Sequence, residues 1–397
     1  MQNMIEYVKW RGDISFKAFP ICEADYLVFA QLSYLPFEGI VDECFDAKTT
    51  LGQAAKKVLE NIEAGGGRYV ISLAENVLLL REILKSPRFF DLPICGFTDI
   101  LSEKRQEQFS AVTFLIPDHE DPGNCACVVA FRGTDSTLVG WKEDFNMAFS
   151  RAVPAQLDAV RYLERAHRAY PLQRLFVCGH SKGGNLAAYS AAFCDGDTSD
   201  SVAAVRNLDG PGFPEEVLMS AGFRKIASRI ENVVPASSIV GILFENTDHF
   251  VVIRSYSNSM PFQHNPFTWE IERDGYVEVE RITTSSVYID DTITKWLSSM
   301  TDDMREKLVN GIFTLVNATG IDDIRKFFNG KNIMTVLHEV KKLDPDTRKV
   351  MNDAISLFNS ASGNNLPKFI DKLIRSTGSA STLPERKREN IKIKLNT

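Results

Sequence analysis

Residues 175–189 read LFVCGHSKGGNLAAY, an apolar run that passes through glycine, histidine and serine into a segment rich in small residues. The spacing Gly179-x-Ser181-x-Gly183, between an expected strand and an expected helix, is the sequence form of a nucleophile elbow. In that turn the serine backbone is strained, and the flanking glycines lack the Cβ atoms that would clash as strand and helix close together. We predict that Ser181 is a nucleophile; an ordinary glycine-rich loop is the alternative.

The composition is that of a globular chain with an acidic balance. Its 397 residues are 44% hydrophobic and 24% charged, and the formal net charge is -7. A chain of this kind can bury a full core, and its charge argues against nucleic acid as a partner. The first residues carry the charges of Glu6, Lys9, Arg11 and Asp13, where a secretory signal has an apolar run, and no segment has the length of a membrane-spanning helix. We expect a cytoplasmic protein with no integral membrane segment.

The cysteines predict neither a disulfide framework nor a metal site. There are seven of them, an odd number, and several lie in apolar runs such as residues 125–129, which suits reduced, buried thiols. Cys125 and Cys127 have no second pair of cysteines or histidines at zinc-site spacing. We expect no metal, and the chemistry predicted below requires no cofactor.

The periodicity of apolar residues predicts three regions. Residues 1–100 form an N-terminal helical region that flanks the active site, residues 101–290 form the core, and residues 291–397 form a C-terminal helical region with a basic tail. The tail, residues 384–397, holds five basic and two acidic residues. We expect it to be solvated, with contact to an anionic membrane surface or to a partner as the alternative.

In the core region, strand patterns alternate with helix patterns. Besides the strand before Ser181, strands are expected at residues 109–116, 125–132, 202–208, 229–234, 250–256 and 268–271. The first two form a hairpin, and residues 154–170 are expected to form an amphipathic helix. Repeated strand–helix–strand units predict an α/β fold with a mostly parallel central sheet and helices on both faces.

A nucleophilic serine needs a general base, and chain position favours His264. It lies in a proline-bounded loop after the last expected strand, which is where a hydrolase sheet delivers its base. His249 is the alternative. His180 precedes the serine directly, and its side chain is expected to point away from the serine.

The base in turn needs an acid, which should lie between Ser181 and His264 in chain order. Asp209 ends the strand that follows the elbow helix. The next strand, the more usual place for the acid, carries Asn232, and an amide can orient an imidazole but cannot stabilise its positive charge. We favour Asp209, with Glu231 and Asp248 as alternatives; a turn-forming Asp-Gly pair would also explain Asp209.

Acyl transfer also needs hydrogen-bond donors for the oxyanion. One is expected to be the backbone N–H of Lys182, the residue after the nucleophile. The other is expected at Thr134, in the FRGTD stretch of residues 131–135, where a strand ends in a glycine-containing loop. Thr134 can offer both its N–H and its hydroxyl, and an ordinary β-turn is the alternative.

Three segments resemble signatures of the class 3 lipases, which have the α/β-hydrolase fold. Residues 129–135 (VAFRGTD) and 140–144 (GWKED) look like their F-R-G-T and W-x-x-D motifs, and residues 179–184 (GHSKGG) resemble their G-H-S-x-G-G elbow. The resemblance implies that Thr134 serves the oxyanion hole. It also implies that Trp141 and Asp144 are structural, with Asp144 fixing Arg132 and the loop.

The layout of roughly residues 5–290 resembles more closely a bacterial, lipase-like hydrolase family of unassigned function. The matching segments are residues 7–13 (YVKWRGD), 32–37 (LSYLPF), 209–213 (DGPGF), 238–241 (SIVG) and 264–269 (HNPFTW). Where class 3 lipases have the acid, in D-x-V-P, this chain has Asn232. The DGPG segment instead resembles the L-D-P-A-x-P segment of pancreatic-type lipases, which supports Asp209.

These inferences predict a serine hydrolase that cleaves carboxylic esters, acyl lipids included, through an acyl-enzyme intermediate. Ser181, His264 and Asp209 form the triad, and Thr134 and Lys182 bind the oxyanion. The partner is a small-molecule or lipid ester, and the oligomeric state is open. Two alternatives remain: a catalytically inactive binding or scaffold protein that keeps the fold, and a thioesterase or peptidase that uses the same triad.

Overall fold

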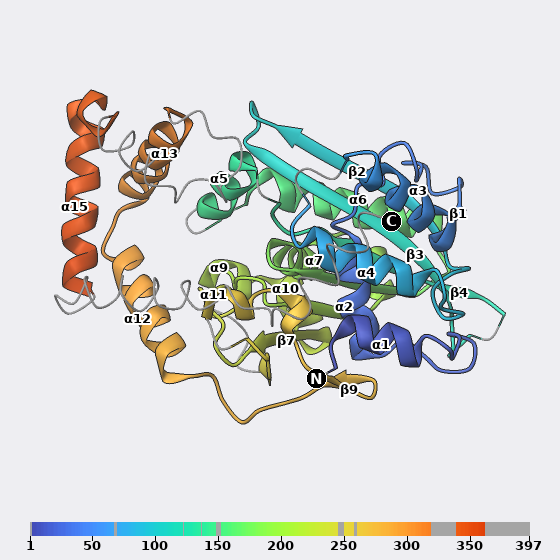
Figure 1. Cartoon of the computed structure of the whole chain (residues 1–397). Coiled ribbons are helices and arrows are strands. Elements are labelled where there is room, and N and C mark those ends of the chain that lie inside the picture. Colours follow the sequence, from blue (N-terminus) through green and yellow to red (C-terminus); the bar gives the residue numbers. More distant parts are fainter. Residues whose placement is uncertain are drawn as a thin grey trace, which may run out of the picture.

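The computed structural model describes residues 2–66, 70–121, 123–135, 137–147, 152–244, 250–257, 260–318 and 339–361. The candidates Asp248 and His249 and the basic tail therefore lie outside the described residues. Figure 1 shows a central sheet with helices on both sides and a group of helices beside it.

The central sheet has eight strands whose order across the sheet follows their order in the chain. The strands are β1 (Thr49–Thr50), β2 (Pro93–Ser102), β3 (Glu107–Pro117), β4 (Cys125–Phe131), β5 (Leu175–His180), β6 (Val202–Leu208), β7 (Ile230–Pro235) and β8 (Phe250–Ile253). The pairs from β1 to β4 are antiparallel, and the pairs from β4 to β8 are parallel. The mostly parallel sheet is confirmed, and so is the hairpin, which is β3 and β4.

One face of the sheet carries the helices that connect the parallel strands. Such crossovers are almost always right-handed, so strands that succeed one another in a single direction receive their helices on the same face. The side chains of Val129, Phe131 and Val177 accordingly pack in one buried cluster with helices α6, α7 and α10. The elements between the parallel strands are α5 (Leu138–Asn146), α6 (Pro154–Ala169), α7 (Lys182–Phe193), α8 (Gly196–Ser201), α9 (Glu215–Leu218), α10 (Ala221–Ile226) and the 3₁₀ turn η1 (Ala227–Arg229).

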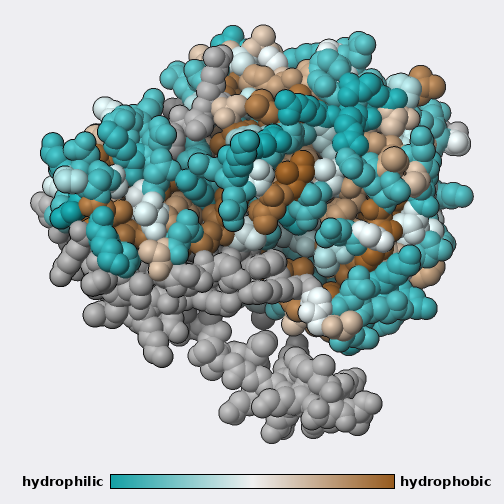
Figure 2. All heavy atoms as spheres, turned by 90° about the horizontal axis from the view of Figure 1, so that it is seen from above, coloured by the Kyte–Doolittle hydropathy of each residue, from teal (hydrophilic) through white to brown (hydrophobic). Residues whose placement is uncertain are grey.

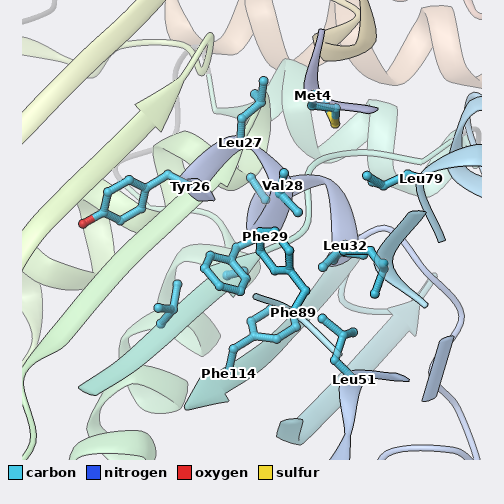
Figure 3. Close-up of a cluster of buried hydrophobic side chains, with 14 of the residues drawn as sticks. Met4, Tyr26, Leu27, Val28, Phe29, Leu32, Leu51, Leu79, Phe89 and Phe114 are labelled. Carbon is cyan, nitrogen blue, oxygen red and sulfur yellow. The ribbon is translucent and has the colours of Figure 1, made fainter. Parts of the chain in front are cut away.

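The other face is covered by the N-terminal helices α1 (Met4–Arg11), α2 (Glu23–Leu32), α3 (Leu51–Glu63) and α4 (Leu73–Ile83). Figure 3 shows their apolar side chains meeting those of the sheet, with the Phe29 ring 4.8 Å from the ring of Phe114 on β3 and 5.8 Å from that of Phe89. Helices on both faces are therefore confirmed. With eight strands and these two layers, the chain has an α/β-hydrolase fold.

Two strand assignments from the sequence are wrong. Residues 1–100 were expected to form a helical region in which Pro93 is a break, but β2 begins at Pro93, since proline is tolerated at the first position of a strand. Residues 268–271 were expected to add a strand to the sheet. Instead the chain there forms the 3₁₀ turn η2 (Pro266–Thr268), and then β9 (Ile271–Glu272) pairs with β10 (Gly275–Tyr276) in a separate small sheet.

The C-terminal helices form a group with a small core of their own. They are α12 (Thr284–Ser298), α13 (Asp302–Ala318), the 3₁₀ turn η4 (Val340–Lys342) and α15 (Pro345–Ala361). Met300, Leu308 and Ala354 are buried between them. The group meets the sheet region at α5, where the ring of Phe145 lies 5.9 Å from that of Phe313 on α13 (Figure 1). The division into three regions stays a prediction, and β2 crosses its first boundary.

The surface seen from above is mostly hydrophilic. Figure 2 shows apolar residues there in separate groups between hydrophilic ones. Within the described ranges, no helix has both the length and the apolar character that a bilayer crossing requires.

A buried carboxyl at the start of β3 is expected to make the free energy of unfolding depend on pH. Burial and the neighbouring Asp158 raise the pKa of Glu107 to about 8, although Arg105 Nε lies 3.1 Å from its Oε2. Between its unfolded pKa of about 4.3 and this value, the folded state holds a proton that the unfolded state has lost, so stability falls as pH rises. We expect wild type to lose up to about 1.4 kcal/mol per pH unit relative to Glu107→Gln over this window. Urea unfolding of both proteins at pH 5.5 and 7.5 measures their free energies of unfolding. If the difference in free energy between the two proteins is the same at both pH values, the prediction is wrong.

Candidate active site

The turn between β5 and α7 places Ser181 at the end of a central strand. Its backbone has φ 59° and ψ -132°, a conformation that residues other than glycine rarely adopt. The turn is also tight: a Cβ on Gly179 would lie 2.2 Å from the backbone of Gly183. The strained turn and the small residues on both sides of it are those of a nucleophile elbow.

The structure brings His264 to Ser181. Its Nε2 lies 2.9 Å from Ser181 Oγ. His264 stands between α11 (Met260–Gln263) and η2, in a loop that is fixed through the preceding residue. The Gln263 side chain accepts a hydrogen bond from the Ser237 N–H at 2.8 Å, and its backbone carbonyl accepts one from Trp269 Nε1 at 2.7 Å. The base candidate is thus held from both sides of the loop.

Asp209 lies on the far side of the His264 ring. Its Oδ2 is 2.7 Å from His264 Nδ1, and the side chain is fully buried. The second oxygen, Oδ1, accepts hydrogen bonds from the Ser238 hydroxyl at 2.5 Å and from the Gly241 N–H at 3.1 Å. The SIVG segment at residues 238–241 therefore holds the carboxylate, a role that the sequence did not indicate.

Glu231, the other acid candidate among the described residues, lies away from His264. Glu231 on β7 faces Arg206, with 3.6 Å between Glu231 Oε1 and Arg206 Nε, and burial raises the pKa of this carboxyl. Asn232 accepts a hydrogen bond from the Asn207 side chain at 2.9 Å, across the pair β6 and β7. The residue at the usual position of the acid thus belongs to a contact between strands.

Thr134 and Lys182 flank the serine as oxyanion candidates. Lys182 begins α7, and the N–H groups in the first turn of a helix have no carbonyl partner within the helix. Thr134 is nearly buried and donates its hydroxyl to Asp144 Oδ2 at 2.6 Å. Burial raises the pKa of Asp144 to about 6 against the opposing effect of Lys182, so this carboxylate is mostly ionised at pH 7. The Thr134 hydroxyl proton is therefore held by Asp144, so the backbone N–H is the group of Thr134 that remains a candidate oxyanion donor.

The predicted contact between Asp144 and Arg132 is wrong. Arg132 donates instead to both carboxylate oxygens of Asp99 on β2, at 2.8 and 3.0 Å. A fork of two parallel hydrogen bonds suits a guanidinium and a carboxylate, and Asp99 presents both of its oxygens. Asp144 is left to hold Thr134.

Glu143, next to Asp144 on α5, links the elements around the site through its buried carboxylate. Its carboxylate is fully buried and accepts hydrogen bonds from Lys182 Nζ at 3.0 Å, from the Gln108 N–H at 3.0 Å and from the Ala155 N–H at 2.9 Å. One carboxylate thereby joins α5 to β3, α6 and α7. It also supplies the charge that a buried lysine needs. The GWKED motif contains Glu143, but nothing in the motif distinguishes this role.

His180 and Tyr34 also belong to the site. His180 does not contact the serine hydroxyl, but its side chain packs on the base: its Nε2 lies 2.8 Å from the backbone oxygen of His264, and the two rings are 4.6 Å apart. Its Nδ1 is 3.1 Å from the hydroxyl of Tyr34. Tyr34 lies in the LSYLPF segment, so both residues come from motifs visible in the sequence.

A pocket of about 660 Å³ lies beside residues 131–135, the segment that carries the oxyanion candidate Thr134 and is here called the oxyanion loop. Its lining mixes polar and apolar side chains, among them Tyr34, Phe97, Asp99, Arg132 and Asp135. Tyr34, which lines the pocket, also contacts the side chain of His180, the residue before Ser181. The pocket has the size of a small-molecule binding site.

Several solved lipases are similar to this chain. M37 lipase is 13% identical over 55% of this chain and 69% of its own, with a TM-score of 0.34. A fungal lipase is 14% identical over 59% of this chain and 79% of its own, with a TM-score of 0.33. A mutant form of MDLA from Penicillium cyclopium is 12% identical over 65% of this chain and 85% of its own, with a TM-score of 0.34.

No curated protein matches the chain. A model of the Mbeg1-like family matches residues 83–314, a stretch that contains the elbow, the oxyanion loop, Asp209 and His264. Since this match spans more than half of the sequence, the chain belongs to the Mbeg1-like family.

Proposed function

We propose that this protein is a serine hydrolase that cleaves carboxylic esters, acyl lipids included. The observation that carries the proposal is the unbroken chain of contacts from Ser181 Oγ through the His264 ring to the buried carboxylate of Asp209, at 2.9 and 2.7 Å. A serine hydroxyl, an imidazole and a carboxylate in this order are the parts that activate a serine nucleophile.

In the proposed reaction, Ser181 Oγ attacks the ester carbonyl while His264 Nε2 takes the serine proton. Asp209 keeps the proton on Nδ1 and stabilises the imidazolium that forms. The Lys182 and Thr134 N–H groups bind the oxyanion. His264 then protonates the departing alcohol, which leaves an acyl group on Ser181, and a water activated by His264 releases the acid.

The pocket beside the oxyanion loop gives part of the ester a place to bind. Its lining includes Arg132 and Asp135, on either side of Thr134 in the chain, and offers both apolar surface and hydrogen-bonding groups. We propose that a small-molecule or lipid ester enters from this side. A cytoplasmic location and a solvated C-terminal tail remain predictions.

The arrangement also bears on the alternative of an inactive scaffold. That alternative rested on Asn232 at the usual position of the acid. Asp209 contacts His264 from the end of β6, so an amide at residue 232 does not deprive the base of its partner. A thioesterase or peptidase would use the same groups, since all three reactions pass through a tetrahedral intermediate.

The test combines turnover with active-site labelling. We expect full-length protein to hydrolyse p-nitrophenyl esters in a series from acetyl to palmitoyl, and a fluorophosphonate probe to modify Ser181. An acyl thioester and a p-nitroanilide with the same acyl group separate the three hydrolase activities. Folded protein that turns over none of them and resists the probe would establish the scaffold instead.

The hydrogen bond from Thr134 to Asp144 predicts how the oxyanion loop tolerates substitution. Thr134→Val keeps the backbone N–H but loses the hydroxyl that anchors it, so we expect kcat to fall by roughly 10- to 100-fold, less than the loss of a whole donor. Thr134→Ser keeps the anchor and is expected to stay close to wild type. The kcat and KM of both variants on the best p-nitrophenyl ester measure this. Equal losses in the two variants would contradict it.

A further inference from the structure

The residue before the nucleophile closes a ring of contacts around the active site. The His180 side chain reaches the His264 backbone oxygen at 2.8 Å, the His264 ring reaches Ser181 Oγ at 2.9 Å, and Ser181 is bonded to His180 through the chain. Three residues, His180, Ser181 and His264, therefore fix the distance between the nucleophile and the base. We propose that His180, oriented by Tyr34, is the positioning residue for the base His264; this inference rests on the proposed hydrolase function.

The hydrogen bonds determine the form of His180. A carbonyl oxygen can only accept, so the contact with the His264 oxygen requires a proton on His180 Nε2. Nδ1 of a neutral ring is then an acceptor, and the Tyr34 hydroxyl at 3.1 Å donates to it. Burial raises the pKa of the Tyr34 hydroxyl, which keeps it protonated as a donor. Both ring nitrogens of His180 are thus satisfied in a single tautomer.

The environment keeps His180 neutral while His264 cycles. Burial, together with repulsion from a charged His264, holds the pKa of His180 well below its usual value. When His264 takes the serine proton, the ring 4.6 Å away therefore adds no like charge. The ring of Trp269 packs against that of His180 as well, with the ring centroids 5.8 Å apart and the ring planes at 69° to each other.

Tyr34 ties the base to the oxyanion loop. A Cβ on Gly133 would lie 2.1 Å from the Tyr34 hydroxyl oxygen and 2.5 Å from the His180 carbonyl oxygen, so the loop rests directly on this pair. The same hydroxyl thus contacts His180 and the residue before Thr134. Errors in the placement of a reacting group by about 1 Å can cost about 100-fold in rate, so a contact of this kind has a measurable effect.

Two substitutions of His180 separate its hydrogen bond from its ring. His180→Phe keeps an aromatic ring against His264 but loses the donor to the His264 carbonyl. His180→Gln loses the ring, but its side-chain amide extends about as far as Nε2 and can donate to that carbonyl. We expect kcat on p-nitrophenyl butyrate to fall about 100-fold in His180→Phe with little change in KM. We expect His180→Gln to recover most of this loss.

Tyr34→Phe is tested beside Tyr7→Phe, a matched control. Both variants lose a buried tyrosine hydroxyl, but Tyr7 donates to Asp25 at 2.8 Å, in a cluster with Arg88 away from the catalytic residues. We expect both variants to melt at lower temperature and only Tyr34→Phe to lose kcat. Equal kcat in the two variants, or wild-type kcat in His180→Phe, would overturn the positioning role.

A proton NMR measurement separates this inference from the proposed function. The Nδ1 proton between His264 and Asp209 gives a strongly low-field resonance when the two are held in contact, whether or not an ester is turned over. We expect this resonance in wild type and in His180→Gln, and its broadening or loss in His180→Phe. A protein that hydrolyses no ester but shows this pattern would refute the proposed ester hydrolysis and leave the positioning role intact. An unchanged resonance in folded His180→Phe would refute the positioning role.

Discussion

Ser181→Ala is expected to lower kcat for ester hydrolysis by about 10⁴-fold or more, because no other group on the chain then accepts the acyl group. The substitution removes only the hydroxyl whose oxygen lies 2.9 Å from His264 Nε2. KM should change little, since the binding surfaces remain. Steady-state kinetics on the best p-nitrophenyl ester, with the fluorophosphonate probe as a second readout, measure this loss. Retained turnover by the variant would mean that Ser181 is not the nucleophile.

Ser181→Gly provides the control for folding. The φ of 59° at this position is strained for any residue with a Cβ, and such strain costs about 1–3 kcal/mol. Glycine adopts this conformation without strain but loses more chain entropy on folding. We therefore expect Ser181→Gly to be inactive and at least as stable as wild type, whereas Ser181→Ala keeps the strain. An inactive variant that is also more stable shows that the lost activity reflects lost chemistry.

Asp209→Asn is expected to lower kcat by about 10⁴-fold through the wrong tautomer of His264. The Gly241 N–H points at Oδ1 and requires an oxygen there. The amide nitrogen of asparagine must then face His264 Nδ1 as a donor, which moves the imidazole proton to Nε2 and leaves no acceptor for Ser181. The pH dependence of kcat/KM distinguishes this effect from a general loss of structure. If His264 can no longer accept the serine proton, hydroxide must accept it, so the residual kcat/KM of the variant should rise with pH.

Two controls test whether another residue is the acid. Glu231→Gln should keep wild-type kcat, because the Glu231 carboxylate faces Arg206. Asn232→Asp, introduced into Asp209→Asn, should not rescue activity, because the side chain at residue 232 contacts Asn207 between the strands. Rescue by this second substitution would show that the acid can act from the end of β7.

The central features of the fold and the site could be predicted because they are local in the sequence. The elbow at Ser181 needs only a strand, two glycines and a helix in succession. The hairpin of β3 and β4 and the alternation after it predict the sheet. His264 and Asp209 follow from chain order, and the structure places His264 against Ser181 and Asp209 against His264.

What could not be predicted depends on contacts between distant segments. Tyr34 and His180 are 146 residues apart, and no local pattern links them. Asp144 ends the GWKED motif, and the resemblance to class 3 lipases implied that its carboxylate contacts Arg132. Arg132 pairs instead with Asp99 on β2, a position that the motif does not reveal, and Asp144 accepts the hydrogen bond from Thr134. The strand β2 was itself missed, because Pro93 resembles a break in the chain as much as the first residue of a strand.

The layered fold also constrains how the protein can be made. Met4 and Ile271 belong to the same hydrophobic core, so the helices synthesised first pack on a face that is finished only after β8. At about 5–20 residues per second, the ribosome needs roughly 10–50 s to make the chain between them. During that time the strands on which α1 to α4 pack are not all present, so the apolar sides of these helices stay partly exposed. Exposed apolar surface of this kind promotes aggregation. We therefore expect the yield of folded protein in a cell to depend on the fate of the nascent N-terminal segment, which measurements on the finished fold do not report.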